Sequence, residues 1–162
     1  MPFNFIEAGD EDIPKIRELY QNSRKIPGCT WNDNYPTDRE IMDDRKRHSL
    51  FVLKDQENEL IGCISIDNDP EVLKLSCWSE HLAPRAELAR LAVAGSYQNR
   101  GIAPLLIQNA MKEAKNRGYQ STCYLVSKHH ERALRSYRKM HYNKAGETDL
   151  FGQEWWCYEK EL

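Results

Sequence analysis

The alternation of apolar and polar positions divides the chain into short strands and amphipathic helices. An alternating run predicts a strand over residues 3–8. Proline, glycine and asparagine predict a loop over residues 26–36. Between the two, apolar residues at helical spacing predict a helix that Asp10 caps and whose buried face carries Ile13, Ile16, Leu19 and Tyr20.

A second helix and a β-hairpin are predicted after this loop. Thr37 and Glu40 form a capping box, which predicts a helix that ends near residue 48. Two runs rich in β-formers, residues 49–53 and 60–66, flank a polar turn and predict a hairpin. A mixed run over residues 71–78 predicts one more short strand.

The second half of the chain alternates between predicted strands and helices. A strand is predicted over residues 85–93, and a helix over 102–117 that ends before a glycine. The remaining elements are a strand at 123–126, a helix at 131–139 and strands at 144–150 and 154–159. No repeat or linker interrupts this order, so the sequence predicts one α/β domain over residues 1–162. Its sheet is expected to be mostly antiparallel, with a central strand–loop–helix unit.

Composition and charge exclude several classes of protein. Apolar residues make up 40 % of the chain and charged residues 30 %, as in globular proteins. With 23 basic and 25 acidic side chains the net charge is −2, which argues against a nucleic-acid partner. No apolar run approaches the ~20 residues that span a bilayer, and no secretion signal is visible at the start. We therefore expect no membrane partner and a cytoplasmic location.

The cysteines and histidines give no metal site. The five cysteines are widely spaced and form no CxxC motif, which favours free thiols in a reducing compartment. His129 and His130 are adjacent at the start of a predicted helix, without other ligands nearby in sequence. They are expected to serve the helix start or to contact a cofactor.

The loop at residues 98–103 lies between the strand 85–93 and the following helix. The free N–H groups and the dipole at a helix start favour an anion such as phosphate. Gly101 allows the backbone to approach closely, and Arg100 adds a positive charge. The loop lacks the glycines of GxGxxG and the Gly-Lys-Ser/Thr of a P-loop. An ordinary strand–turn–helix is the alternative interpretation.

This loop resembles the Q/R-x-x-G-x-G/A motif of the GNAT superfamily of N-acetyltransferases, and Leu-Ala-Val at residues 91–93 precedes it as in that family. A second segment is similar to the family pattern N-x-x-A-x-x-L/F-Y, with His130, Ala133, Ser136 and Tyr137 at the four positions. His130 in place of Asn and Ser136 in place of Leu or Phe depart from that pattern.

The resemblance implies a GNAT-like mixed sheet flanked by helices, with two central strands that splay apart. It also implies acetyl-CoA as co-substrate, no metal, and direct attack of an amine on the thioester. Backbone amides of residue 91 or 93 would then face the acetyl oxygen. The residues implied in cofactor binding are Leu91, Ala92, Val93, Gln98, Asn99, Arg100, Gly101, Ile102, Ala103, His130, Ala133 and Tyr137.

Two side chains are candidates for proton transfer. The resemblance implies Tyr137 as general acid, and its phenol, with a reference pKa near ~10, can donate a proton at neutral pH. Core packing is the alternative for this tyrosine. Glu87 is the nearest carboxylate on the central strand and would share a face with Ala89 and Leu91 by period two. A surface carboxylate, a base that acts through water, or no base at all are the alternatives.

The acceptor and the assembly are the least determined features. In the family, the loop between the first two helices builds a wall of the acceptor site. Here it offers Trp31, Asp33 and Tyr35, which suit a small cationic amine; a structural loop in which Trp31 covers the core is the alternative. The expected partner is a small-molecule amine, and a homodimer is possible through free strand edges. A catalytically silent acyl-CoA sensor and a protein or peptide acetyltransferase are the competing functions.

Overall fold

A seven-stranded sheet runs through the computed structural model, which describes residues 3–162. The spatial order of the strands is β1-β2-β3-β4-β5-β7-β6. Every neighbouring pair is antiparallel except β4 and β5, which are parallel. The prediction of a mixed, mostly antiparallel sheet is therefore confirmed. The strands are β1 (Asn4–Glu7), β2 (Leu50–Lys54), β3 (Leu60–Asp67), β4 (Arg85–Val93), β5 (Ser121–Ser127), β6 (Asn143–Leu150) and β7 (Gln153–Glu161).

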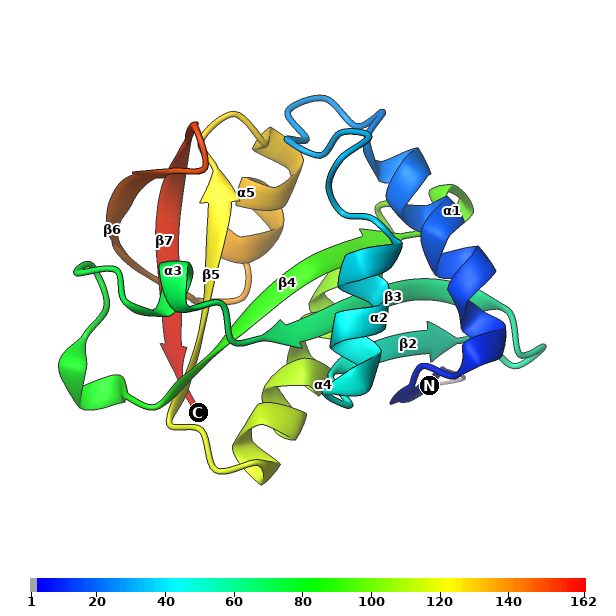
Figure 1. Ribbon diagram of the computed structural model, residues 1–162, viewed down its shortest axis with the longest axis horizontal. Coiled ribbons are helices and arrows are strands. Elements are labelled where there is room, and N and C mark those ends of the chain that lie inside the picture. Colours follow the sequence, from blue (N-terminus) through cyan, green and yellow to red (C-terminus); the bar gives the residue numbers. More distant parts are fainter. Residues whose placement is uncertain (1–2) are drawn as a thin grey trace.

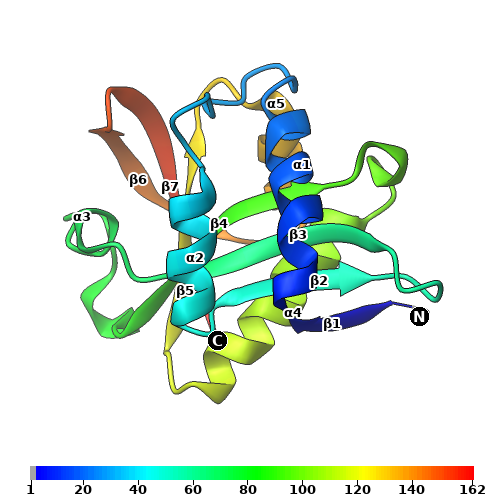
Figure 2. The same cartoon turned by 45° about the vertical axis from the view of Figure 1, so that its right-hand side comes forward.

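Helices cover both faces of the sheet. Helices α1 and α2 lie on one face, and α4 lies on the other (Figures 1 and 2). The short α3 follows β3 in the chain, and α5 follows β5. The bounds are α1 (Ile13–Ser23), α2 (Asp38–Lys46), α3 (Pro70–Leu73), α4 (Ile102–Asn116) and α5 (Glu131–Arg138).

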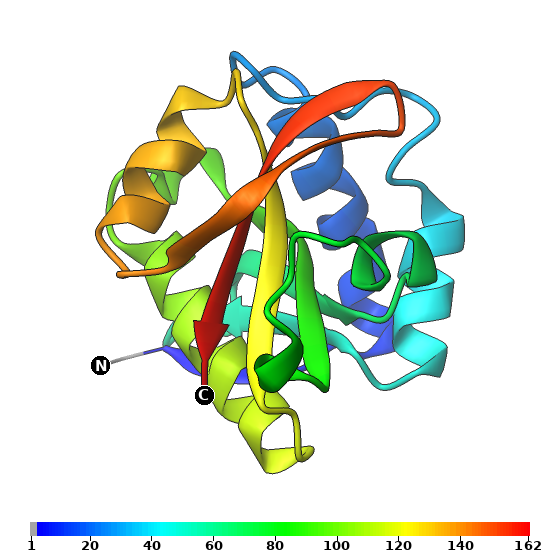
Figure 3. The same ribbon diagram turned by 90° about the vertical axis from the view of Figure 1, so that its left-hand side faces the viewer.

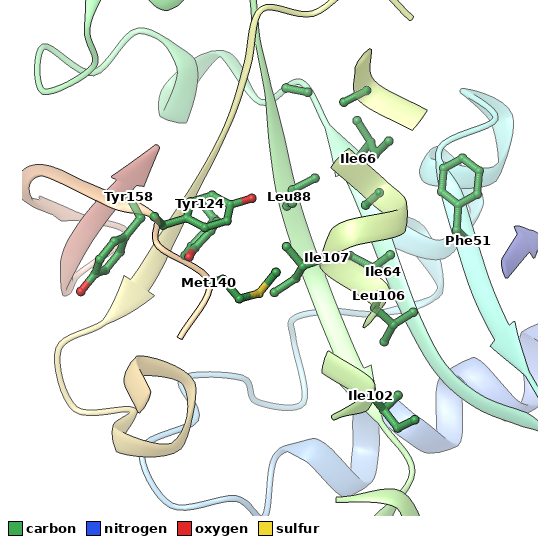
Figure 4. Close-up of a cluster of buried hydrophobic side chains, with 14 of the residues drawn as sticks. Phe51, Ile64, Ile66, Leu88, Ile102, Leu106, Ile107, Tyr124, Met140 and Tyr158 are labelled. Carbon is green, nitrogen blue, oxygen red and sulfur yellow. The ribbon is translucent and has the colours of Figure 1, made fainter. Parts of the chain in front are cut away.

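Two of the three apolar clusters of the described residues fill the space between the sheet and helices α1 and α4. The larger one lies between the sheet and α4 and extends to the tyrosines of β5 and β7. Figure 4 shows its members Leu88 and Ile107, with Met140, Tyr124 and Tyr158 at one end. The smaller cluster lies beneath α1 and contains Ile16, Leu19, Tyr20, Val52 and Ala92.

Most predicted elements are confirmed, with boundaries that differ by a few residues. The capping box is present: the Thr37 side chain accepts from the Arg39 amide, and the Glu40 carboxylate accepts from the Thr37 amide at 3.0 Å. The predicted strand at 71–78 is wrong, because Asp69 caps the helix α3 there, with its carboxylate 3.0 Å from the Glu71 amide.

Asp10 does not cap the first helix as predicted. A short 3₁₀ turn over Asp10–Asp12 precedes α1. The carboxylate of Asp12, not that of Asp10, accepts the Gly9 amide at 2.9 Å. Asp12 directly precedes α1, although its side chain makes no cap hydrogen bond to that helix, and it pairs with the buried ammonium of Lys54 of β2 at 2.8 Å.

Candidate active site

The site lies where β4 and β5 separate. The two strands are paired only from Arg85–Ser121 to Glu87–Cys123. They then diverge, as Figures 1 and 3 show. A cleft of about 480 Å³ occupies this region, lined by β4, β5, the first turns of α4, helix α5 and the loop after α1. The expected splay of the two central strands is present.

A β-bulge interrupts β4 within this cleft. Between the cross-strand pairs Cys63–Ala92 and Ser65–Ala89, β4 contains two residues where β3 contains one. One of the two is Arg90, whose φ of 51° is left-handed. For a residue other than glycine this conformation costs ~1–3 kcal/mol and requires compensating contacts.

The bulge corrects one prediction. Simple alternation would put Glu87 and Leu91 on the same face of β4. Instead, Leu88 belongs to the cluster beneath α4, and Leu91 and Val93 pack against that same cluster. Because the extra residue inverts the alternation, Glu87 and Leu91 lie on opposite faces of the strand.

Beyond the bulge, the free edge of β4 faces the cleft. The Val93 carbonyl accepts a hydrogen bond from Gln98 Nε2 at 2.8 Å, on the side away from β3. The neighbouring Ala94 amide bonds to Ile61 of β3 at 2.8 Å. Since N–H and C=O of one strand residue point the same way, the Val93 amide is directed toward the separated β5. The side chain of Ala92 lies in the cluster beneath α1, so only its backbone borders the cleft.

The loop before α4 lies where the free edge of β4 ends. Gly101 has φ 79°, and no side chain caps the first turn of α4. A Cβ on Gly101 would meet no atom within 4 Å, so the space beside this turn is open. Unpaired amides facing open space fit a phosphate group. The cleft lining includes Gln98, Asn99, Gly101, Ile102, Ala103 and Pro104, whereas Arg100 lies outside it, with its guanidinium 4.7 Å from the centre of the Tyr97 ring.

The opposite wall carries two tyrosines in contact. The rings of Tyr137 of α5 and Tyr124 of β5 have centroids 4.2 Å apart, and both residues line the cleft. Burial raises the pKa of Tyr137 to about 12, so the phenol keeps its proton at neutral pH. The hydroxyl of Tyr124 is buried and has no hydrogen-bond partner within residues 3–162. Sequence reasoning missed Tyr124, because its position in an apolar strand predicts only a core residue.

Helix α5 is capped by one of the predicted contact residues. His130 Nδ1 accepts the Ala133 amide at 3.3 Å, which places His130 at the helix start as expected. Burial lowers the pKa of His130, in agreement with a neutral ring that accepts a hydrogen bond. A further side chain that the sequence did not reveal, Arg132, donates to Gln98 Oε1 at 3.2 Å and joins α5 to the loop before α4.

Glu87 lies where β4 and β5 are still paired, below the residues that line the cleft. It is 8 % exposed, and its Oε1 has no hydrogen-bond partner in the described part of the chain. Burial, together with the negative charge of Asp67, raises the pKa of Glu87 to about 8, against the opposite effect of Arg90. It is thus a buried carboxyl that titrates near neutral pH, and not a surface carboxylate.

The loop after α1 contributes its three predicted residues unequally. Trp31 lines the cleft and also packs edge-on against Tyr20 of α1, with ring centroids 5.4 Å apart. The hydroxyl of Tyr35 accepts from Arg90 Nη1 at 2.9 Å. The Asp33 side chain is 98 % exposed and forms an ion pair with Arg24, outside the cleft lining. The structure therefore brings Trp31, but not Asp33, to the cleft.

Two further properties bear on the class of protein. Over residues 3–162, no three His, Cys, Asp or Glu side chains come together as a metal site. None of the helices in this range is long and apolar enough to cross a membrane.

The sheet order, the separated parallel strands and the loop–helix unit define an α/β acyltransferase domain. Residues 13–142 match the model of the acetyltransferase (GNAT) family, and the chain belongs to this family of acetyl-CoA-dependent enzymes. A search of curated protein sequences gives no significant match.

Solved structures of three other proteins share this fold. A phosphinothricin acetyltransferase from Sinorhizobium meliloti, in complex with acetyl-CoA, aligns with a TM-score of 0.78 at 14 % identity, over 100 % of this chain and 89 % of that one. Ard1 from Thermoplasma volcanium gives 0.76 at 16 % identity, over 100 % and 99 %. A spermidine N-acetyltransferase chimera from Vibrio cholerae SpeG and hSSAT gives 0.73 at 16 %, over 99 % and 96 %.

Proposed function

We propose that this protein transfers an acetyl group from acetyl-CoA to the primary amine of a small molecule. The observation that carries the proposal is the single continuous cleft. It runs from the open space beside Gly101, along the free edge of β4, past Tyr137 to Trp31. One end thus suits a nucleotide pyrophosphate and the other an organic amine, with a proton donor between them.

The residues of the cleft fit acetyl-CoA. The first turn of α4 would hold the pyrophosphate, and Arg132 and Lys139, which line the cleft, add positive charge for phosphate groups. The free edge of β4 would pair with the amides of the pantetheine arm, as an added strand does. When bound, acetyl-CoA supplies an acetyl group activated as a thioester.

The reaction needs a bond change at one carbon and the movement of two protons. The acceptor nitrogen bonds to the carbonyl carbon as the bond between that carbon and sulfur breaks. The Val93 amide stabilises the negative charge that develops on the carbonyl oxygen. Tyr137 donates its phenolic proton to the leaving sulfur. Glu87, which is ionised above its pKa of about 8, then receives a proton from the nitrogen through water, because its carboxyl lies below the cleft lining.

The shape of the acceptor end favours a small molecule. Gly28, with φ 85°, packs so closely against the start of α5 that a Cβ there would overlap the carbonyl of His129. The loop after α1 therefore bridges toward the turn after β5, as Figure 1 shows at its top, and both segments contribute residues to the lining of the cleft. Such a cover limits access for a folded protein more than for a free amine.

The test measures binding and turnover separately. Calorimetry with acetyl-CoA should show binding, and thiol release should follow on addition of an amine from a panel of spermidine, amino acids, an aminoglycoside and short peptides. Release with a small amine supports the proposal. Binding without release from any amine would instead identify a silent acyl-CoA sensor, and release with peptides alone would identify a peptide acetyltransferase.

A further inference from the structure

A network of charged side chains lies beneath the cleft, centred on Arg90 in the bulge of β4. Its guanidinium forms two hydrogen bonds to Asp44 of α2, from Nε to Oδ2 at 2.9 Å and from Nη2 to Oδ1 at 2.8 Å. Nη2 also donates to Asp67 at the end of β3, at 2.9 Å. Nη1 donates to the hydroxyl of Tyr35 in the loop after α1, at 2.9 Å. The side chain of Arg90 thus connects β4 to three other segments, which are α2, β3 and the loop after α1.

The centre of this network is buried and its charges balance. Arg90 is 8 % exposed and Asp44 only 1 %, whereas the side chains of Asp67 and Arg47 at its edge are half-buried. Arg47 completes the network by donating to Asp44 at 2.6 Å and to Asp67 at 3.3 Å. Two arginines therefore match two aspartates, and no positive charge remains unmatched for Glu87 nearby. Buried ion pairs add little net stability because both ions lose water. Stability alone therefore does not explain the Arg90–Asp44 pair.

The position of Arg90 in the bulge suggests another reason for keeping this pair. A left-handed residue other than glycine persists only where its surroundings determine it, and here three partners hold the Arg90 side chain. The bulge they hold turns the free edge of β4, with the Val93 amide, toward the cleft. The same guanidinium is the positive charge that acts on Glu87.

We propose that Arg90 is a positioning residue for acetyl transfer, which fixes the β4 bulge and the Tyr35 loop and balances the charge around Glu87. The inference rests on the proposed function, in which Glu87 accepts a proton. The groups that act on Glu87 or are affected by it are Asp67 of β3, Asp69 after β3, Asp44 of α2, Arg90 of β4, Cys123 of β5 and Tyr35 of the loop.

The first experiment follows the carboxyl of Glu87 directly, by ¹³C NMR titration of the free protein, and needs no acceptor. D67N removes a negative charge and should lower the pKa of Glu87 by about one unit, whereas R90Q removes a positive charge and should raise it by a similar amount. D38N is the matched control, because Asp38 forms an equivalent bidentate pair with Arg17 on the surface. Its titration should equal that of the wild type.

The second experiment separates geometry from charge. R90K keeps the charge but cannot reproduce the fork of hydrogen bonds, so it should lower kcat about tenfold with the most reactive amine of the panel while leaving the titration of Glu87 near wild type. D67N should move the rising limb of the pH–rate profile to lower pH with little loss of kcat. General damage to the fold would lower the rate without moving this limb.

These results distinguish the two proposals. If D67N leaves both the Glu87 titration and the pH–rate profile unchanged, and R90K turns over like the wild type, the role of Arg90 is refuted. This outcome does not depend on R90Q, so a failure of that variant to fold would change nothing. E87Q with full turnover and an unchanged profile would refute Glu87 as base, whereas the NMR shifts of D67N and R90Q would still establish the charge network.

Discussion

The two walls of the cleft are stabilised by different interactions. On the β4 wall, the buried guanidinium of Arg90 and the carboxylate of Asp44 hold a left-handed residue in a bulge. On the β5–α5 wall, aromatic rings pack together: the ring centroid of Tyr124 lies 4.2 Å from that of Tyr137, 4.5 Å from that of Tyr142 and 5.7 Å from that of Tyr158. The first wall depends on charge and the second on apolar burial.

This difference separates what a substitution does to folding from what it does to chemistry. Removing a hydroxyl from a stacked ring keeps most of the buried area, so the β5–α5 wall should tolerate Tyr-to-Phe changes. On the β4 wall, a change of charge alters the titration of Glu87, and the loss of the Arg90 guanidinium alters the packing of the bulge as well. Substitutions on each wall, and at the two ends of the cleft, therefore test this contrast.

The largest effect is expected for Y137F on the aromatic wall. The variant keeps the ring that packs on Tyr124 and removes the proton that the leaving sulfur needs, so kcat should fall by ~10²–10⁴-fold. Folding and acetyl-CoA affinity should stay near wild type, as steady-state kinetics and calorimetry would show. Since the pKa of Tyr137 is about 12, this loss should be constant between pH 7 and 9.

Tyr124 provides the matched control for this prediction. Its phenol also lines the cleft and is also buried, with no partner among residues 3–162. Y124F should keep turnover within a few-fold of wild type. If Y124F loses turnover and Y137F keeps it, Tyr124 is the acid and the assignment from the family resemblance is wrong.

The next largest effect concerns the phosphate end of the cleft. G101D adds a negative charge beside the first turn of α4 and should weaken acetyl-CoA binding by more than tenfold, which is ~1.4 kcal/mol. G101A isolates the cost of a side chain at φ 79°, since a Cβ there meets no neighbouring atom. Calorimetry should therefore show a much smaller loss for G101A. Equal losses in both variants would indicate backbone strain and not phosphate repulsion.

Local patterns in the sequence predict most of this fold. The helix α4 and the strand β4 have local signals, such as apolar spacing and the glycine at each end of the helix, and the structure places both within a residue or so of the prediction. Errors occur where a distant contact decides. Asp12, and not Asp10, accepts the Gly9 amide before α1 and pairs with Lys54 of β2, and no pattern within residues 8–13 contains that contact.

The candidate site divides in the same way. The loop around Gly101 is built from consecutive backbone amides, so its sequence describes it completely. The surroundings of Glu87 and Arg90 come from five separate segments. A one-residue bulge also inverts the alternation that placed Glu87 beside Leu91. Spacing along one strand predicts neither these surroundings nor the bulge, because the pairing of β4 with β3 determines where the bulge lies.

A smaller effect is expected from the pH dependence of stability on the β4 wall. Glu87 has a pKa of about 8 when folded, against about 4.3 in an unfolded chain. Between these values the folded state holds more protons than the unfolded state, so stability falls as pH rises through this window. From pH 7 to 8, the wild type should therefore lose about 1 kcal/mol of stability more than E87Q, which is ~2–4 °C of Tm. E147Q, at an exposed glutamate, should behave like the wild type; equal slopes in wild type and E87Q would show that Glu87 is ionised throughout.

The smallest effect is expected at the cover of the cleft, which belongs to neither wall. Trp31 lines the cleft but also packs on Tyr20, so W31A should raise the acceptor KM several-fold and lower Tm, while W31F should recover most of both. Acetyl-CoA affinity should not change, because the phosphate loop lies at the other end of the cleft. D33N serves as the control from the same loop: the carboxylate of Asp33 is 98 % exposed and pairs with Arg24, so the acceptor KM of this variant should equal that of the wild type. A rise in KM for D33N as large as that for W31A would place the acceptor outside the cleft, over the exposed face of this loop.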